Sequence, residues 1–211
     1  MNYFFFFFCL LLVTFPKSLC AQKKLFKEYD VSDTHSLYIE SDAIFKIKLT
    51  TSQTDKIAIY TQIDGETYES TLLHTEIVDG VLKVTTGRTP DFIPFNDKLS
   101  AHKILSIVLE ITLPEGFTID IYSTLASVEA QGNYNKIRAN LGSGGCYLSG
   151  IRFRESVYIN TISGNIELET KKATIQAQSR NGTIVIPKGM TGIKIVRLQS
   201  IDGDITVINS Q

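Results

Sequence analysis

The chain has 211 residues, of which 43% are hydrophobic and 20% are charged, and its net charge is −1 at pH 7. This length allows one domain with a sizeable core. Basic and acidic residues are mixed along the chain, which provides neither a basic patch for nucleic acid nor a cationic amphipathic stretch for a membrane surface.

Residues 1–21 are predicted to form a secretory signal peptide. The apolar run at residues 4–15 has the length of a signal-peptide core and is too short for a transmembrane helix. Cleavage is expected after Cys20 or Ala21. Lys17 stands where a lipidation motif requires an aliphatic residue, so no lipid anchor is expected at Cys20. The predicted location is the periplasm, the outer surface or the medium.

Cys146 is the cysteine that is certain to remain after cleavage. An exported domain with no internal partner for this thiol has no disulfide. Its stability must therefore come from packing and hydrogen bonds.

Residues 22–118 are predicted to be an N-terminal β region. Four segments alternate apolar and polar residues, the period of a strand with one buried face. They are residues 36–39, 45–49, 56–60 and 81–84. Asp79-Gly80 predicts a tight turn. Residues 86–103 contain Pro90 and Pro94 without periodicity and predict a long surface loop, after which a strand is expected up to Leu113.

From residue 119 to residue 209 the sequence repeats. Frames start at Ile119, Ile137, Val157, Ile175 and Val196. Apolar residues recur two positions after each start, and a glycine recurs seven positions after four of the five. These glycines are Gly144, Gly164, Gly182 and Gly203. Further apolar residues follow at positions nine and eleven of each frame.

Each frame is predicted to hold two short strands with a corner at the glycine. One frame cannot bury its apolar face alone, whereas stacked frames share a continuous interior. At the corner, positive φ or close backbone packing excludes a Cβ atom. Hydroxyl side chains just before it suit hydrogen bonds to the turn backbone. The prediction is an all-β fold, a single-stranded β-helix or β-solenoid of five coils with an N-terminal β region. A β-sandwich or meander is the alternative.

Several segments resemble the putative adhesin family, which comprises bacterial envelope or secreted β-solenoids also described as a domain of unknown function. The similar segments are residues 111–116, 163–168, 181–186 and 202–207. The resemblance covers about residues 30–209 as one continuous domain. It implies an exported protein of a Bacteroidota type and carries over no catalytic residue. A shared fold does not fix function.

No cofactor, metal or catalytic residue is predicted. Asp202 and Asp204 form an acidic corner that the other frames do not repeat, unlike the short repeats of calcium-binding solenoids. Glu129 and Glu167 are expected on one face but two coils apart, about 10 Å, which is too far for a retaining glycosidase pair and marginal for an inverting one.

One outward group of side chains is predicted to form a surface binding site. Tyr147 and Tyr158, flanked by Arg138 and Arg197, offer aromatic and cationic contacts to a glycan or protein. Ordinary solvated strand faces are the alternative. The chain ends soon after the last coil, so we expect that coil to leave an open edge for self-association.

These patterns predict an exported cell-envelope protein that presents a surface as an adhesin or binding module without catalysis. One alternative is a structural or regulatory envelope protein that acts through a protein partner. A second is a carbohydrate-active enzyme.

Overall fold

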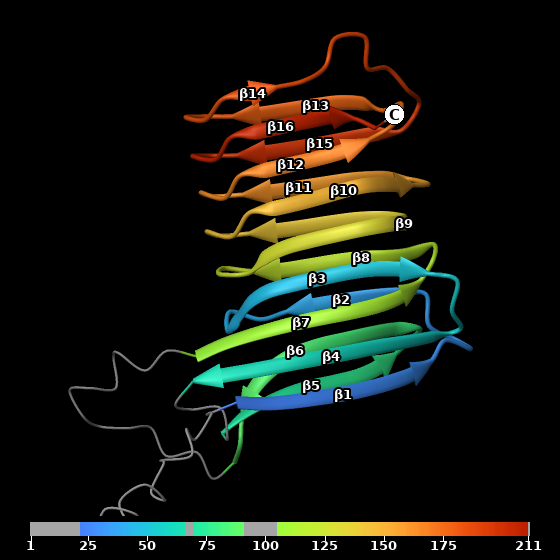
Figure 1. Ribbon diagram of the computed structural model, residues 1–211, viewed down its shortest axis with the longest axis vertical. Coiled ribbons are helices and arrows are strands. Elements are labelled where there is room, and N and C mark those ends of the chain that lie inside the picture. The colour runs from blue at the N-terminus through green and yellow to red at the C-terminus, as the bar shows by residue number, and fades with distance from the viewer. Residues whose placement is uncertain (1–21, 66–69, 91–104, 211) are drawn as a thin grey trace, which may run out of the picture.

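The computed structural model describes residues 22–65, 70–90 and 105–210 (Figure 1). Over these residues the chain forms sixteen β-strands and no α-helix, so the all-β prediction is confirmed. In the same ranges no helix is long and apolar enough to cross a membrane. The predicted signal peptide, residues 1–21, lies outside the described residues.

Eight strands come from the region before residue 124. They are β1 (Gln22–Asp30), β2 (Ser36–Glu40), β3 (Ile44–Ser52), β4 (Lys56–Gly65), β5 (Thr71–Val78), β6 (Val81–Arg88), β7 (Leu105–Pro114) and β8 (Phe117–Ser123). The pairs β1–β4, β4–β7 and β5–β6 are antiparallel. The predicted turn between β5 and β6 is present, with positive φ at both Asp79 and Gly80 (51° and 73°), as a two-residue hairpin loop requires.

The predicted loop at 86–103 begins too early. β6 continues through Arg88 because its last residues pair with β5, so that Thr86 lies opposite Leu73 and Gly87 opposite Leu72. Backbone pairing holds this segment extended although its side chains lack the apolar alternation that marks a strand in the sequence. Residues 91–104 lie outside the described residues.

Eight more strands follow and, together with β8, cover the predicted frames. They are β9 (Ser127–Leu141), β10 (Cys146–Phe153), β11 (Ser156–Thr161), β12 (Ile166–Thr170), β13 (Thr174–Ser179), β14 (Ile184–Val185), β15 (Ile195–Ser200) and β16 (Ile205–Asn209). They pair in parallel and form two ladders, which the long strand β9 joins because it contributes to both.

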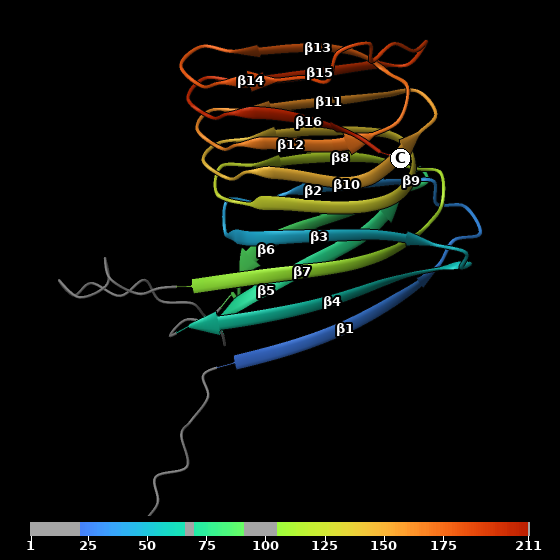
Figure 2. The same ribbon diagram turned by 45° about the horizontal axis from the view of Figure 1, so that its top comes forward.

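The first ladder runs β2–β8–β9–β11–β15–β13, and the second runs β3–β9–β10–β12–β16–β14 (Figures 1 and 2). The frame starts pair with one another along the first ladder, in the order Ile119, Ile137, Val157, Val196 and Ile175. The residues nine positions later pair along the second ladder, in the order Val128, Cys146, Ile166, Ile205 and Ile184. Each frame therefore lies on another frame in the same register.

The inward side chains of both ladders form one hydrophobic core. Tyr134 is its largest fully buried member, and its hydroxyl reaches the carbonyl oxygens of Leu49 (3.2 Å) and Gln131 (3.0 Å). Cys146 is fully buried, and burial raises the pKa of its thiol to about 12. The only free cysteine among the described residues is therefore a core side chain.

The corner glycines stack on one another at the edge where β11 turns into β12 and β15 into β16, on the left in Figure 1. A Cβ atom on Gly164 would lie less than 3.0 Å from the backbone of Gly144, and one on Gly203 equally close to the backbone of Gly164. None of the four predicted corner glycines has a positive φ. Close backbone approach, rather than a left-handed conformation, therefore requires glycine here.

Hydroxyl groups cap three of these corners, those at Gly164, Gly182 and Gly203. The side-chain oxygen of Ser200 accepts a hydrogen bond from the backbone N–H of Gly203 at 2.8 Å, and Ser179 accepts one from Gly182 at 3.0 Å. Thr161 donates to the carbonyl oxygen of Gly164 at 2.7 Å. These bonds satisfy turn backbone groups that the ladders leave without a partner.

The last frame does not lie at the end of the two ladders, and the expectation of an open edge at that frame is wrong. β15 lies between β11 and β13, and β16 lies between β12 and β14. The open edge belongs to β13 and β14, which come from the preceding frame. There Ile184, Val185 and Ile186 are 38–53% exposed.

Candidate functional site

The outward side chains of the first ladder form two rows, because strand residues of the same parity point to the same side. The first row contains Tyr38, Asp120, Arg138, Tyr158, Arg197 and Gln176. The second row contains Glu40, Tyr122, Asn140, Asn160, Gln199 and Gln178. We call these two rows together the polar-aromatic face.

Hydrogen bonds along the ladder hold the side chains of the upper part of this face. The Tyr158 hydroxyl donates to Oε1 of Gln199 at 3.1 Å. The Nε–H of Arg197 donates to Oε1 of Gln176 at 2.9 Å. Because these side chains are already held by partners on neighbouring strands, they lose less conformational entropy when a ligand binds.

Tyrosines and a second arginine make up the lower part of the face. The rings of Tyr38 and Tyr122 lie 5.6 Å apart with a tilt of 40°. The Tyr38 hydroxyl donates to Glu40 at 2.8 Å, and this bond together with desolvation raises the Tyr38 pKa to about 12. A hydrogen bond with Tyr122 and the nearby Asp120 raise the pKa of Arg138. Both groups keep their protons at neutral pH and can donate hydrogen bonds.

A shallow groove of about 490 Å³ crosses the face between β9, β11 and β15. Arg138, Tyr158 and Arg197 line it together with Lys136 and the aliphatic side chain of Ile195. The groove combines one aromatic ring, three cationic groups and an apolar wall, a composition suited to a ligand that is both polar and flat on one side.

The structure brings together three of the four predicted binding residues. Tyr158 pairs with Arg138 on one side and with Arg197 on the other. Tyr147 lies on the second ladder, between Glu129 and Glu167. The polar-aromatic face therefore presents Tyr158, Arg138 and Arg197 to a ligand, and Tyr147 is not part of it.

The sequence prediction missed Tyr38, Tyr122 and the amide row. Tyr38 comes from β2, which precedes the repeated frames and carries no frame register. The amides do carry a signal, since they occupy position three of their frames. These residues are Asn140, Asn160, Gln178 and Gln199.

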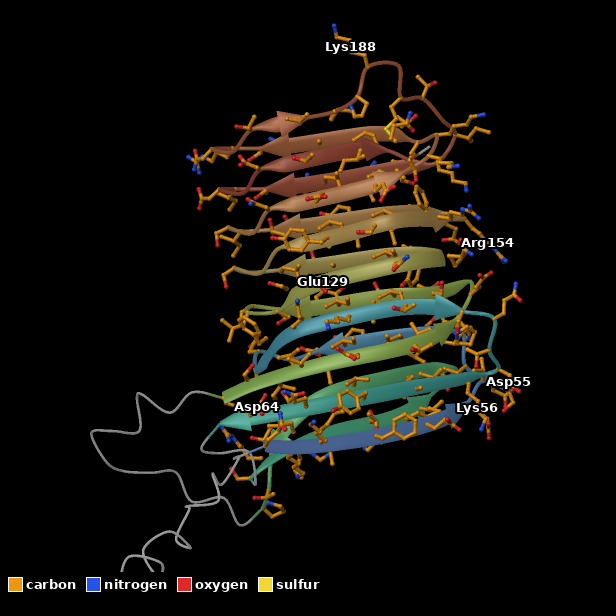
Figure 3. The ribbon with its side chains drawn as sticks, viewed as in Figure 1. Asp55, Lys56, Asp64, Glu129, Arg154 and Lys188 are labelled. Atoms are coloured by element: carbon orange, nitrogen blue, oxygen red, sulfur yellow. The ribbon has the colours of Figure 1, made fainter. Side chains whose placement is uncertain are left out.

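The second ladder carries the carboxylates considered for catalysis. Tyr147 separates Glu129 from Glu167 in the ladder register, as expected. Glu129 pairs with Lys46 at 2.6 Å, and its outward position is visible in Figure 3. The two carboxylates therefore do not converge on a common point.

The acidic corner forms hydrogen bonds within the stack. Oδ1 of Asp202 accepts from the side-chain amide of Asn181 at 2.6 Å, and Oδ1 of Asp204 accepts from the backbone N–H of Thr183 at 2.7 Å. Within the described ranges no three His, Cys, Asp or Glu side chains gather as metal ligands would.

The fold and this face define an all-β protein that presents two in-register rows of aromatic, amide and guanidinium groups. The crystal structure of a putative cell adhesion protein from Clostridium sporogenes has the same fold. The superposition gives a TM-score of 0.64 at 16% sequence identity and covers 90% of this chain and 100% of that one.

Two Bacteroidota proteins are also similar, with lower scores. A putative adhesin from Bacteroides fragilis gives a TM-score of 0.39 at 14% identity, covering 89% of this chain and 97% of that one. A putative adhesin from Parabacteroides merdae gives 0.33 at 12% identity, covering 90% and 97%. No protein-family model and no curated protein matches the sequence.

Proposed function

We propose that this protein is an exported cell-envelope binding module without catalytic activity, and that its polar-aromatic face binds a glycan. The observation that carries the proposal is the arrangement of that face, where Tyr158 stands between Arg138 and Arg197 above a row of amides. Aromatic rings pack against the C–H faces of sugars, and amide and guanidinium groups form hydrogen bonds with hydroxyls. Equal strand spacing repeats these groups at intervals of about 4.8 Å, which suits an extended chain of sugars.

We also propose that the five frames form a β-solenoid. The in-register parallel pairing of frame on frame supports this, as does the stacked column of corner glycines. A solenoid is stiff along its stacking axis, since each coil is hydrogen-bonded to its neighbours. Stiffness preserves the spacing of the two rows and lowers the entropic cost of holding a long ligand.

Export is part of the proposal. Residues 1–21 are predicted from the sequence to form a signal peptide, and the similar structure from Clostridium sporogenes is that of a putative cell adhesion protein. A protein that binds glycans at the envelope must be exported to meet them. Expression of the full chain with detection of mature protein outside the cytoplasm tests this part.

Glycan binding is tested with the chain from residue 22 to residue 211, on a glycan array and then by calorimetry with the glycans that bind. Tyr158→Ala is expected to weaken binding about tenfold, since a stacked aromatic group contributes on the order of 1–2 kcal/mol. Tyr147→Ala is the matched control, because Tyr147 is an outward tyrosine on the other ladder. Binding that depends on Tyr147 but not on Tyr158, or no glycan binding at all, would contradict the proposal.

A second candidate function is assembly with a protein partner, which the open edge of β13 and β14 favours. We propose a second copy of this chain as that partner. In β13, Ile175 and Ala177 are half-buried and alternate with exposed residues. Antiparallel pairing of β13 with β13 of the other copy, about a two-fold axis at Gln176, places each Ile175 opposite Ala177 of the other copy. The same pairing covers the exposed residues 184–186 of both copies. Sedimentation velocity is expected to show a dimer that Val185→Lys dissociates, and a strict monomer at high concentration would contradict this.

A further inference from the structure

A groove lies at the edge of the stack opposite the glycine corners. It is formed where β10 and β12 end and where the chain enters β15, and its volume is about 440 Å³. Ile151 and Phe153 form the floor, and both are almost completely buried. Ile193 stands beside the floor with its side chain 100% exposed. Figure 3 shows Arg154 at this edge of the molecule.

The rim of this groove is cationic. Arg152, Lys171, Lys172 and Lys194 all line it. A second, smaller groove of about 230 Å³ adjoins the first, with which it shares Arg152, Phe153 and Lys194. It adds one further cation, Arg154, and one carboxylate, Glu115. We call the two grooves together the basic groove. It places five cationic side chains around one apolar trough.

These cations have no carboxylate partners in the described part of the chain. The five ion pairs found there all lie elsewhere. The nearby carboxylates bind amide groups instead: Glu115 accepts from Asn133 at 2.7 Å, and Glu155 accepts from Asn135 at 3.0 Å. The groove therefore has a surplus of positive charge, which an anion would neutralise.

Lys194 fixes the geometry of the groove. Its ammonium donates to the carbonyl oxygen of Phe153 and lies 5.4 Å from the centroid of the Phe153 ring. This contact ties the segment before β15 to the end of β10 and keeps Ile193 beside the trough. The apolar floor and the cationic rim are consequently held together as one surface.

We propose that the basic groove binds an anionic amphiphile, a molecule with a carboxylate, sulfate or phosphate head and an aliphatic chain. The head meets the guanidinium and ammonium groups at the rim, where charge-assisted hydrogen bonds are strongest. The aliphatic chain covers Ile193 and the trough and removes apolar surface from water. The exposed apolar side chain at the trough is the aliphatic Ile193, which offers a surface for a hydrocarbon chain. The face proposed for glycans lies elsewhere, on the first ladder.

The experiment titrates the chain from residue 22 to residue 211 with monomeric decanoate and follows the binding by NMR. Two probes separate the requirements of the site: butanoate has the same head with a short chain, and decyl maltoside has a similar chain with a neutral head. Decanoate is expected to bind about tenfold more tightly than either probe. Equal binding of decyl maltoside would overturn the requirement for an anion, and equal binding of butanoate would overturn the requirement for a chain.

Variants locate the site. The double variant Arg152→Gln/Lys172→Gln is expected to weaken decanoate binding about tenfold, and Ile193→Ser about threefold. Lys188→Gln is the control, since Lys188 lies on the same segment before β15 but does not line the groove (Figure 3). All of these side chains are exposed, so an unchanged unfolding midpoint shows that each variant folds. Equal loss in the control, or no loss in the double variant, would refute the site.

Vesicles distinguish the source of the amphiphile. Binding to phosphatidylglycerol vesicles but not to phosphatidylcholine vesicles, lost in the double variant, indicates that a lipid headgroup in a membrane is the source. Binding of decanoate without binding to either vesicle indicates a free amphiphile. Failure to bind decanoate and both vesicles would disprove the proposal, and glycan binding would be unaffected by that result.

Discussion

Replacing Gly144 with alanine tests how closely neighbouring frames are packed. A Cβ atom at this position would lie less than 3.0 Å from the backbone of Ala126 and Ser127. Backbone atoms cannot rotate away as a side chain can, so the two frames must separate by about an ångström to admit the methyl group.

The cost in stability follows from the hydrogen bonds that hold these two frames together at the corner. They are the hydrogen bonds Val128 N–Gly145 O (2.8 Å), Gly142 N–Ser123 O (2.9 Å) and Ser143 N–Thr124 O (2.8 Å). A separation of about 1 Å takes all three beyond hydrogen-bond length. At about 1 kcal/mol of net stability for each bond, Gly144→Ala is expected to lower the free energy of unfolding by about 3 kcal/mol.

Gly145→Ala is the matched control from the same corner. A Cβ atom there would approach the Tyr147 ring and hydroxyl at 2.8–3.0 Å, and the Tyr147 side chain is 40% exposed and free to turn aside. We expect a cost below about 1 kcal/mol. Urea unfolding followed by tyrosine fluorescence measures both, with the midpoint shifted and the slope unchanged. Equal costs for the two variants would refute the close-approach account.

Three further predictions concern buried or hydrogen-bonded side chains. The Cys146 thiol, with a pKa of about 12, should resist a thiol reagent at pH 8 in the folded protein and react when urea unfolds it; rapid labelling without urea would contradict its burial. Tyr134→Phe removes the hydroxyl that reaches Leu49 and Gln131 and should lower the free energy of unfolding by about 1 kcal/mol, with an unchanged urea midpoint as the opposing result. The Tyr38 pKa of about 12 in the folded protein lies above the ordinary tyrosine value of 10.0, so its contribution to stability is present below pH 10 and is lost as pH rises through 12. Tyr38→Phe should reduce the decline in unfolding midpoint over that window, and an identical decline in both proteins would count against it.

The all-β class could be predicted because its signal is local. Alternating segments such as residues 45–49 and 56–60 fall in β3 and β4, and the Asp79-Gly80 turn joins β5 to β6. The positions counted along the frames also anticipate which residues pair in the ladders, since an inward position remains inward when identical units stack in register.

The composition of the candidate site was harder to predict, for a geometric reason. Outward residues of one frame belong to two strands separated by a corner, so they project from different ladders. Tyr158 lies at position one of its frame, and Tyr147 lies at position ten. The sequence prediction treated all outward residues as one surface, although they belong to two ladders. Assigning the positions to their strands would have replaced Tyr147 with the amides beside Tyr158.

The order in which the frames stack depends on information that the apolar pattern does not contain. Every frame offers apolar side chains at the same positions, so burial stabilises several stacking orders of the frames almost equally. Polar groups at the corners distinguish the possible stacking orders only weakly. The Asn165 side chain accepts a hydrogen bond from the backbone N–H of Asp204 at 2.9 Å, and it would find a backbone N–H in any frame placed next to it. The connection into the last frame determines which stacking order is adopted. Residues 187–194, with Pro187 and two glycines, lead from β14 back past β13 to β15, which leaves the fourth frame at the open edge.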